Sequence, residues 1–195
     1  MELGVLLCAS LGLRRGEAVG LSWGDIDFEN KLVHIQHSYD NDGHLLPPKT
    51  KAGNRFLPLT DTLATALKRR RDIQIITFRN YAPDLLSLDA NGKESLSPSA
   101  PVISDDLGNR IHPAGLGHWW CNHRSNYGLD GWTLHELRHS FLSLATQKGV
   151  HPSVMQRLAG HSTSRVTMEI YTHVNIEAQR EAMDSLEDVL GPITA

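Results

Sequence analysis

The segment TLHELRHSF, residues 133–141, contains a possible zinc-binding motif. His135-Glu136-x-x-His139 has the H-E-x-x-H pattern, in which two imidazoles one helical turn apart bind zinc and the glutamate acts as general base. Arg138 conflicts with this interpretation, because a guanidinium that stays protonated would lie beside the bound cation. The histidines and this arginine together suit an anion better than a metal ion.

A zinc hydrolase would also need a third protein ligand and an open coordination position for water. The extended metzincin pattern has a glycine and then a histidine after the second histidine of the motif. This chain has Phe141, Leu142 and Ser143 in that part of the sequence. Glu169 is a more distant candidate ligand, so a zinc hydrolase stays as an alternative. The prediction for this segment is that it binds no metal.

Three other segments contain groups suited to the cleavage of a phosphodiester. The segment GLRRGEAVGLSWGDI offers Arg14, whose guanidinium can bind two phosphate oxygens at once. The segment LAGHSTSRVTMEIYTH offers the imidazole of His161 and the hydroxyl of Tyr171, which is a candidate nucleophile. The segment PPKTKAGNRFLPL offers Lys49 or Lys51 as a donor of the proton that the leaving oxygen needs.

In this order along the chain, the segments resemble the conserved blocks of the tyrosine recombinases, the phage-integrase family. The first follows the family pattern G-L-R-x-x-E-x-x-x-L-x-W-x-D-I, and HELRH has the form H-x-L-R-H. The lysine segment resembles the family's P-K-T hairpin, and the last segment resembles L-G-H-S followed by I-Y-T-H. Ala159 departs from this pattern, because the family often has Leu or Met there. By this resemblance, the glutamate of the apparent zinc motif occupies a variable position.

The resemblance implies a domain that cleaves and rejoins DNA through a 3′-phosphotyrosine intermediate, without a metal or other cofactor. Matching the blocks position by position gives the expected catalytic residues: Arg14, Lys49, His135, Arg138, His161 and the nucleophile Tyr171. Glu17 is expected to orient an arginine, and His139 is expected to support His135. Lys51 stays open as the general acid in place of Lys49.

The resemblance also implies double-stranded DNA as the partner, bound by four protomers acting on two duplexes. The acidic amphipathic helix expected over 176–189 is the candidate contact between protomers. The form of the lysine segment and the ten-residue step from His161 to Tyr171 favour an integrase of a phage or another mobile element. A host chromosome-resolving recombinase, a topoisomerase-like relative and a DNA-binding regulator without the chemistry remain alternatives.

The elements that must position these residues follow from the spacing of apolar residues and from turn signals. We expect an α+β, mostly helical fold, that of a tyrosine recombinase catalytic domain, with a small antiparallel three-stranded sheet formed by the runs KLVHIQ, HLLPPKT and RFLPLT. Residues 81–101, rich in Pro, Ser, Asp, Asn and Gly, are expected to form a long flexible loop. The helices are expected near 3–11, 60–79, 113–126, 134–148, 152–159, 164–173 and 176–189.

Composition sets the outer limits of the interpretation. With 195 residues, of which 40% are hydrophobic, the chain can form one domain with a real core. We expect residues 1–195 to be a catalytic domain without the family's N-terminal DNA-binding domain. Two cysteines are too few for a disulfide framework and favour a cytoplasmic protein, and no segment reads as a membrane span. The net charge is −3, yet residues 1–80 carry eleven Lys/Arg against nine Asp/Glu, so a basic surface is compatible with this composition.

Overall fold

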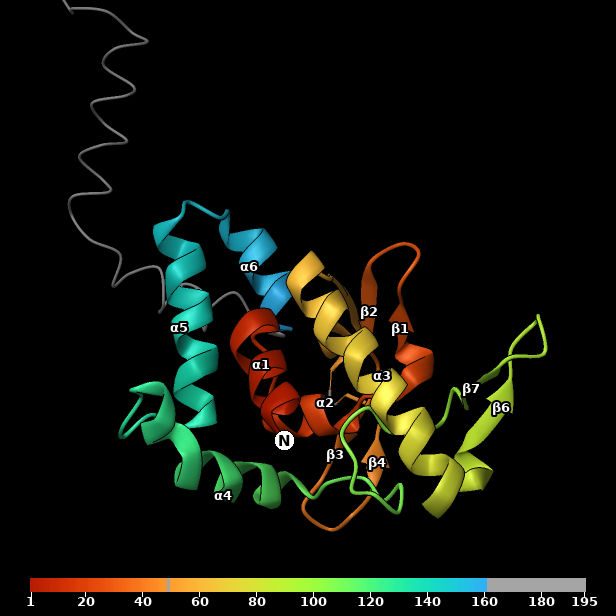
Figure 1. The fold of residues 1–195 in the computed structure, drawn as a ribbon. Coiled ribbons are helices and arrows are strands. Elements are labelled where there is room, and N and C mark those ends of the chain that lie inside the picture. Colours follow the sequence, from red (N-terminus) through yellow and green to blue (C-terminus); the bar gives the residue numbers. More distant parts are fainter. Residues whose placement is uncertain (49, 161–195) are drawn as a thin grey trace, which may run out of the picture.

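The computed structural model describes residues 1–48 and 50–160, in which helices pack around a central helix and a small sheet lies to one side (Figure 1). The expected α+β, mostly helical architecture is confirmed. Lys49, His161, Tyr171 and the helices expected at 164–173 and 176–189 lie outside the described residues. The helices are α1 (Glu2–Leu11), α2 (Arg15–Gly20), α3 (Asp61–Tyr81), α4 (Pro113–His123), α5 (Leu134–Gln147) and α6 (Pro152–Ala159). The strands are β1 (Ile26–Asp27), β2 (Leu32–Ile35), β3 (Ser38–Tyr39), β4 (Leu45–Leu46), β5 (Arg55–Pro58), β6 (Leu86–Leu88) and β7 (Glu94–Leu96).

Helix α1 lies at the centre of the core and contacts α5, α2, α3 and α4 (Figure 1). A helix that is apolar on all sides is typical of such a buried position, and Leu7 and Cys8 are fully buried. Gly12 ends α1 in the left-handed conformation with φ +62°, where a residue with a Cβ would be strained. That Cβ would also approach the ring of Phe141 to 2.6 Å. The glycine turn therefore brings the chain from α1 directly to Arg14.

The predicted three-stranded antiparallel sheet is present, in the order β1-β2-β5. Its composition differs from the prediction in one strand. The run HLLPPKT contributes only β4, which pairs with β3 in a separate two-stranded sheet, because Pro47 and Pro48 cannot donate ladder hydrogen bonds. The third strand of the main sheet is β1, whose Ile26 pairs with Val33. Two residues are too few to show the alternation that marks a strand.

The prediction of a long loop over residues 81–101 was wrong, because this segment contains a β-hairpin. Strands β6 and β7 pair in antiparallel register, with Leu86 opposite Leu96. A tight turn joins them, in which the Asp89 carboxylate accepts the backbone N–H groups of Asn91 and Lys93. Each strand has only three residues and is flanked by turn-forming residues, so the sequence shows no alternating pattern that would predict either strand.

Helix α3 begins where it was predicted, with the Thr60 hydroxyl accepting the Leu63 N–H at the N-cap. Helical spacing predicts an apolar stripe that faces the core, formed by Leu63, Ala66, Leu67, Ile73 and Ile76. The observed buried face matches it only in part, since Ile73 is 47% exposed. Gln74 is buried instead, because its side chain accepts the indole N–H of Trp23 at 2.8 Å. Among the described residues, no helix is both long enough and apolar enough to cross a membrane.

Candidate active site

The first group of the site, Arg14, stands at the junction of α1 and α2. It is the N-cap residue of α2, and its side chain is about half exposed. The guanidinium donates to Glu17 Oε1 at 2.7 Å, and the Arg14 backbone N–H donates to Glu17 Oε2 at 2.9 Å. Glu17 therefore orients Arg14 from one turn inside the helix, and the rest of the guanidinium faces solvent.

The sequence did not indicate the second partner of Glu17, which is Arg55. Arg55 is the first residue of β5, and both side chains of this ion pair are about 95% buried. Its Nη2 donates to Glu17 Oε2 at 2.9 Å and its Nη1 donates to Oε1 at 3.3 Å. Burial alone would raise the pKa of Glu17, but the hydrogen bonds and charge of Arg55, together with Arg14, lower it. The only sequence signal for Arg55 was its position at an alternate, inward-facing site of a short strand.

Arg138 lies deeper than the sequence predicted. Helical spacing predicts that Arg138 shares a polar face with His135 and His139, rotated away from the core face, but Arg138 is only 4% exposed. Its Nη1 donates to the Gly12 carbonyl and its Nη2 donates to the Ala159 carbonyl at 2.7 Å. Both carbonyls lie at helix C-termini, where oxygens lack helical partners and carry partial negative charge. These contacts offset the desolvation of the guanidinium.

Burial, followed by the nearby charge of Arg14, lowers the pKa of Arg138 to about 10. Glu17 opposes this shift, and Arg55 adds to it. Two guanidiniums, those of Arg14 and Arg55, therefore contact one carboxylate, the charge of Arg138 lies near it, and the cluster carries excess positive charge. Such a cluster stabilises an anion, and above all one whose charge increases during a reaction.

His135 and His139 lie together on the first two turns of α5. Their Nε2 atoms are 3.1 Å apart and their rings meet edge to face. Burial, and then the charges of His139, Arg138 and Arg14, lower the pKa of His135, which favours its neutral form. Neutral imidazole can accept a proton or a hydrogen bond at one ring nitrogen.

Glu136, the middle residue of the apparent zinc motif, takes part in the N-terminal cap of α5. The Thr133 N–H donates to its carboxylate, and its own N–H donates to the Thr133 hydroxyl at 3.2 Å. This reciprocal pair is a capping box. Glu136 therefore has a structural partner at the helix start, which accounts for its position beside His135 without a metal.

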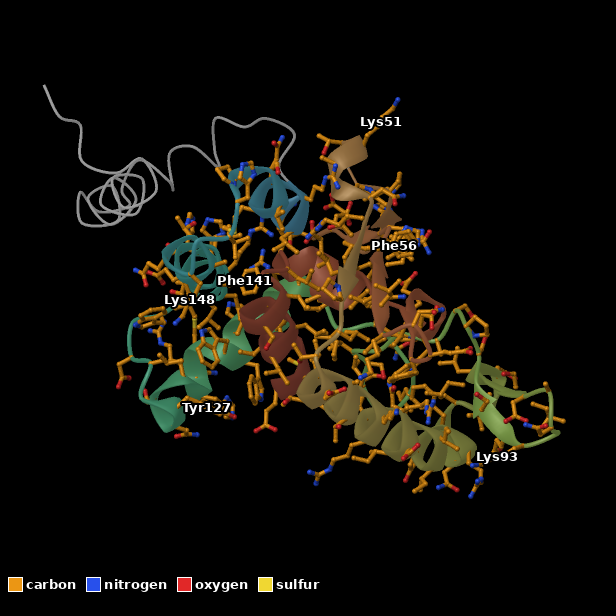
Figure 2. All side chains as sticks on the ribbon, turned by 90° about the horizontal axis from the view of Figure 1, so that it is seen from above. Lys51, Phe56, Lys93, Tyr127, Phe141 and Lys148 are labelled. Carbon is orange, nitrogen blue, oxygen red and sulfur yellow. The ribbon has the colours of Figure 1, made fainter. Side chains whose placement is uncertain are left out.

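The structure thus brings Arg14, Glu17, Arg138, His135 and His139 to one region, formed by the ends of α1, α2 and α5. Of the expected catalytic set, Lys49, His161 and Tyr171 are outside the described residues. The described chain reaches the neighbourhood of His161, since Gly160 caps α6 with φ +61°. The alternative lysine, Lys51, begins a short 3-10 turn and points away from the body of the molecule (Figure 2).

Replacing Glu17 with glutamine should destabilise the folded chain by about 3 kcal/mol at pH 7, because the charge of Arg55 stays buried without its counterion. Since the folded pKa of Glu17 is lowered, its contribution is present above the usual carboxyl pKa of about 4.3 and is lost as the pH falls through the folded value. Urea unfolding at several pH values measures this difference.

The matched control is Glu94→Gln, which removes the partner of Arg79 at the surface. That change should cost less than about 1 kcal/mol at pH 7. Equal losses in the two variants, or a Glu17→Gln loss that stays constant in acid, would contradict the central role of this carboxylate.

Comparison with known proteins identifies the family. The model of the phage integrase family matches residues 2–178. The chain is 30% identical over 196 residues to the tyrosine recombinase XerC-like protein of Caldanaerobacter subterraneus subsp. tengcongensis. This alignment covers 94% of this chain and 48% of that protein. It is 28% identical to the transposase from transposon Tn916 of Enterococcus faecalis, covering 93% of this chain and 44% of the relative. The chain therefore spans about half the length of these curated relatives.

The fold agrees with this result. The Tn1549 transposon integrase, solved in complex with transposon right end DNA, aligns with a TM-score of 0.72 at 23% identity, over 94% of this chain and 58% of that one. The XerA recombinase aligns with a TM-score of 0.62 at 18% identity, over 96% of this chain and 57% of that one. Because the family model matches residues 2–178, nearly the whole of this chain, the chain belongs to the phage integrase family.

Proposed function

We propose that this chain is the catalytic part of a mobile-element tyrosine recombinase, which cleaves and rejoins double-stranded DNA through a 3′-phosphotyrosine. The observation that carries the proposal is the cluster of three arginines, in which Arg14 and Arg55 contact the carboxylate of Glu17 and the charge of Arg138 lies near it. Glu17 fixes the position of Arg14, whose side chain is about half exposed. A phosphodiester needs such donors as negative charge grows on its non-bridging oxygens.

In the proposed reaction, the arginine cluster binds the phosphate, and other residues of the site attack it and transfer protons. The Tyr171 oxygen attacks the phosphorus, a new O–P bond forms, and the bond from phosphorus to the 5′ oxygen breaks. Lys49 supplies the proton to the departing 5′ oxygen, and neutral His135 accepts the proton of the tyrosine hydroxyl. Arg14, with Arg138 behind it, stabilises the charged phosphate. Rejoining reverses these steps, so the bond energy is conserved in the phosphotyrosine.

The relatives support a mobile-element role. They include the Tn916 transposase and the ICEBs1 integrase of Bacillus subtilis, which is 25% identical over 92% of this chain. A host chromosome-resolving recombinase is the second candidate, because the XerC-like relative shares 30% identity. Assembly as four protomers on two duplexes, with the segment 176–189 bridging neighbours, also belongs to this proposal.

Covalent trapping tests the function. The probe is a nicked duplex from the boundaries of the genetic element that carries the coding sequence, designed so that cleavage releases a short fragment that diffuses away. The chain should become attached to the 3′ end, and a denaturing gel should show the adduct at the same level with and without EDTA. An adduct that requires added zinc, or no adduct at either boundary sequence, would overturn the proposal.

A further inference from the structure

The guanidinium of Arg55 joins three segments that are distant in sequence. It forms the buried ion pair with Glu17 described above. Its Nη1 also donates to the Gly53 carbonyl at 3.0 Å, and its Nε donates to the Leu158 carbonyl at 3.0 Å. Nε, Nη1 and Nη2 therefore each have at least one acceptor, and the three acceptor residues, Glu17, Gly53 and Leu158, belong to different parts of the chain.

Each of these segments borders a proposed catalytic residue. Gly53 ends the short 3-10 turn that follows Lys49 and returns the chain to β5. Leu158 is in the last turn of α6, a few residues before His161. Glu17 holds Arg14 through its other contacts. Arg55 thus contacts the loop that follows Lys49, the end of α6 that precedes His161, and the carboxylate that holds Arg14.

The end of α6 is held on two sides. Arg138 donates to the Ala159 carbonyl, while Arg55 donates to the carbonyl one residue earlier. Gly160 lies directly against Arg55, since a Cβ there would come within 2.7 Å of Nη1. The same Cβ would lie 3.1 Å from the Ala52 carbonyl oxygen in the lysine loop. The loop, the guanidinium and the end of α6 are therefore in one continuous contact.

We propose that Arg55 is a positioning residue, which couples the lysine loop at 50–54 to the end of α6 and, through Glu17, to Arg14. It does not touch the substrate, because its side chain is only 6% exposed. Lysine could not replace it, since a single ammonium lacks the planar fork that reaches separate acceptors at fixed angles. The coupling is read from contacts in the structure, while its consequence for cleavage rests on the proposed function.

The first test perturbs the guanidinium from α6 and observes the loop. Gly160→Ala should displace Arg55 and speed hydrogen–deuterium exchange of the Gly53 and Asn54 amides, which donate to carbonyls within the loop. Gly149→Ala is the matched control, because Gly149 also has a left-handed conformation, φ +73°, but a Cβ there meets no atom within 4 Å. Exchange in the loop should increase in the first variant and stay unchanged in the second.

The second test separates positioning from general stability. Arg55→Lys should slow formation of the covalent adduct by about 10- to 100-fold, the effect of a small displacement of reacting groups, with DNA affinity changed less than about 2-fold. Arg70→Lys is its control, because Arg70 also donates to backbone carbonyls, those of Val102 and Ser104, but away from the site. That variant should unfold more easily in urea and cleave DNA at the rate of the unmodified chain once folded.

The outcomes are distinguishable. Equal loop exchange in Gly160→Ala and Gly149→Ala would overturn the coupling, and so would a cleavage loss in Arg55→Lys no greater than in Arg70→Lys. If Arg55→Lys does not fold, the two glycine variants still decide the question. If the unmodified chain forms no adduct, the proposed function fails, while the exchange experiment still shows whether Arg55 joins the loop to α6.

Discussion

Phenylalanine in place of Tyr171 should leave the chain able to bind DNA but unable to form any covalent protein–DNA adduct. The change removes one oxygen, the atom that attacks phosphorus in the proposed reaction, and retains the aromatic ring. Because no other step can proceed without a nucleophile, the loss should be complete and not a fractional decrease in rate. The same nicked duplex and denaturing gel used for the unmodified chain measure it.

Tyr127→Phe is the matched control for this experiment. The Tyr127 hydroxyl donates to Glu2 at 2.8 Å, at the start of α1, whereas Arg14 follows the other end of that helix. Figure 2 shows Tyr127 at the end of α4. Loss of this hydroxyl should leave adduct formation unchanged. An adduct that persists in Tyr171→Phe would mean that another residue attacks, and mass spectrometry of the trapped peptide would identify it.

The fold was predictable where local sequence sets local structure. Helices α3 and α5 begin close to the predicted residues, and a threonine hydroxyl, of Thr60 and of Thr133, accepts a free N–H of the first turn at each N-cap. The hairpin β6–β7 was missed, because three-residue strands show no usable period. Helical spacing alone places Ile73 on the buried face of α3, but the residue buried there is Gln74, whose side-chain oxygen accepts a hydrogen bond from the Trp23 indole.

The site shows the same division between local and long-range information. Arg14 and Glu17 are only three residues apart in the sequence, so their ion pair is foreseeable from local sequence. The burial of Arg138 depends on carbonyls of Gly12 and Ala159, which only the folded chain brings together. Arg55 was missed for the same reason, since a lone arginine in a strand gives no signal of the carboxylate that it meets.

Arg138 also illustrates what the resemblance to a family leaves open. Matched motifs assign it to the phosphate, yet both Nη atoms donate to backbone carbonyls in the DNA-free chain. Its charge nevertheless lies close to the proposed phosphate site, because the charge of Arg14 is among the causes that lower the pKa of Arg138. Arg14 is consequently the more accessible donor, and Arg138 both stabilises the site's structure and adds to its field.

The identity of the general acid gives the second large effect. Lys49→Ala should nearly abolish cleavage of ordinary DNA, because an alkoxide leaves poorly without a proton. A thiolate leaves readily, since a thiol has a pKa of about 8.5, far below that of an alcohol. Replacing the bridging 5′ oxygen with sulfur should therefore restore cleavage to Lys49→Ala. It should do little for Arg14→Ala, which loses stabilisation of the phosphate itself.

Lys51→Ala is the control that fixes the position of the proton donor. Lys51 is exposed at the start of the 3-10 turn and extends outward from the loop, so its loss should leave cleavage of the oxygen substrate largely intact. If sulfur rescues Lys51→Ala and not Lys49→Ala, the assignment within the loop is wrong by two residues. If sulfur rescues neither variant, the lysines only bind DNA and the proton comes from a histidine. His135→Ala or His161→Ala should then be the variant that the sulfur substrate restores, and the imidazole of His135 lies beside the arginines proposed to bind the phosphate.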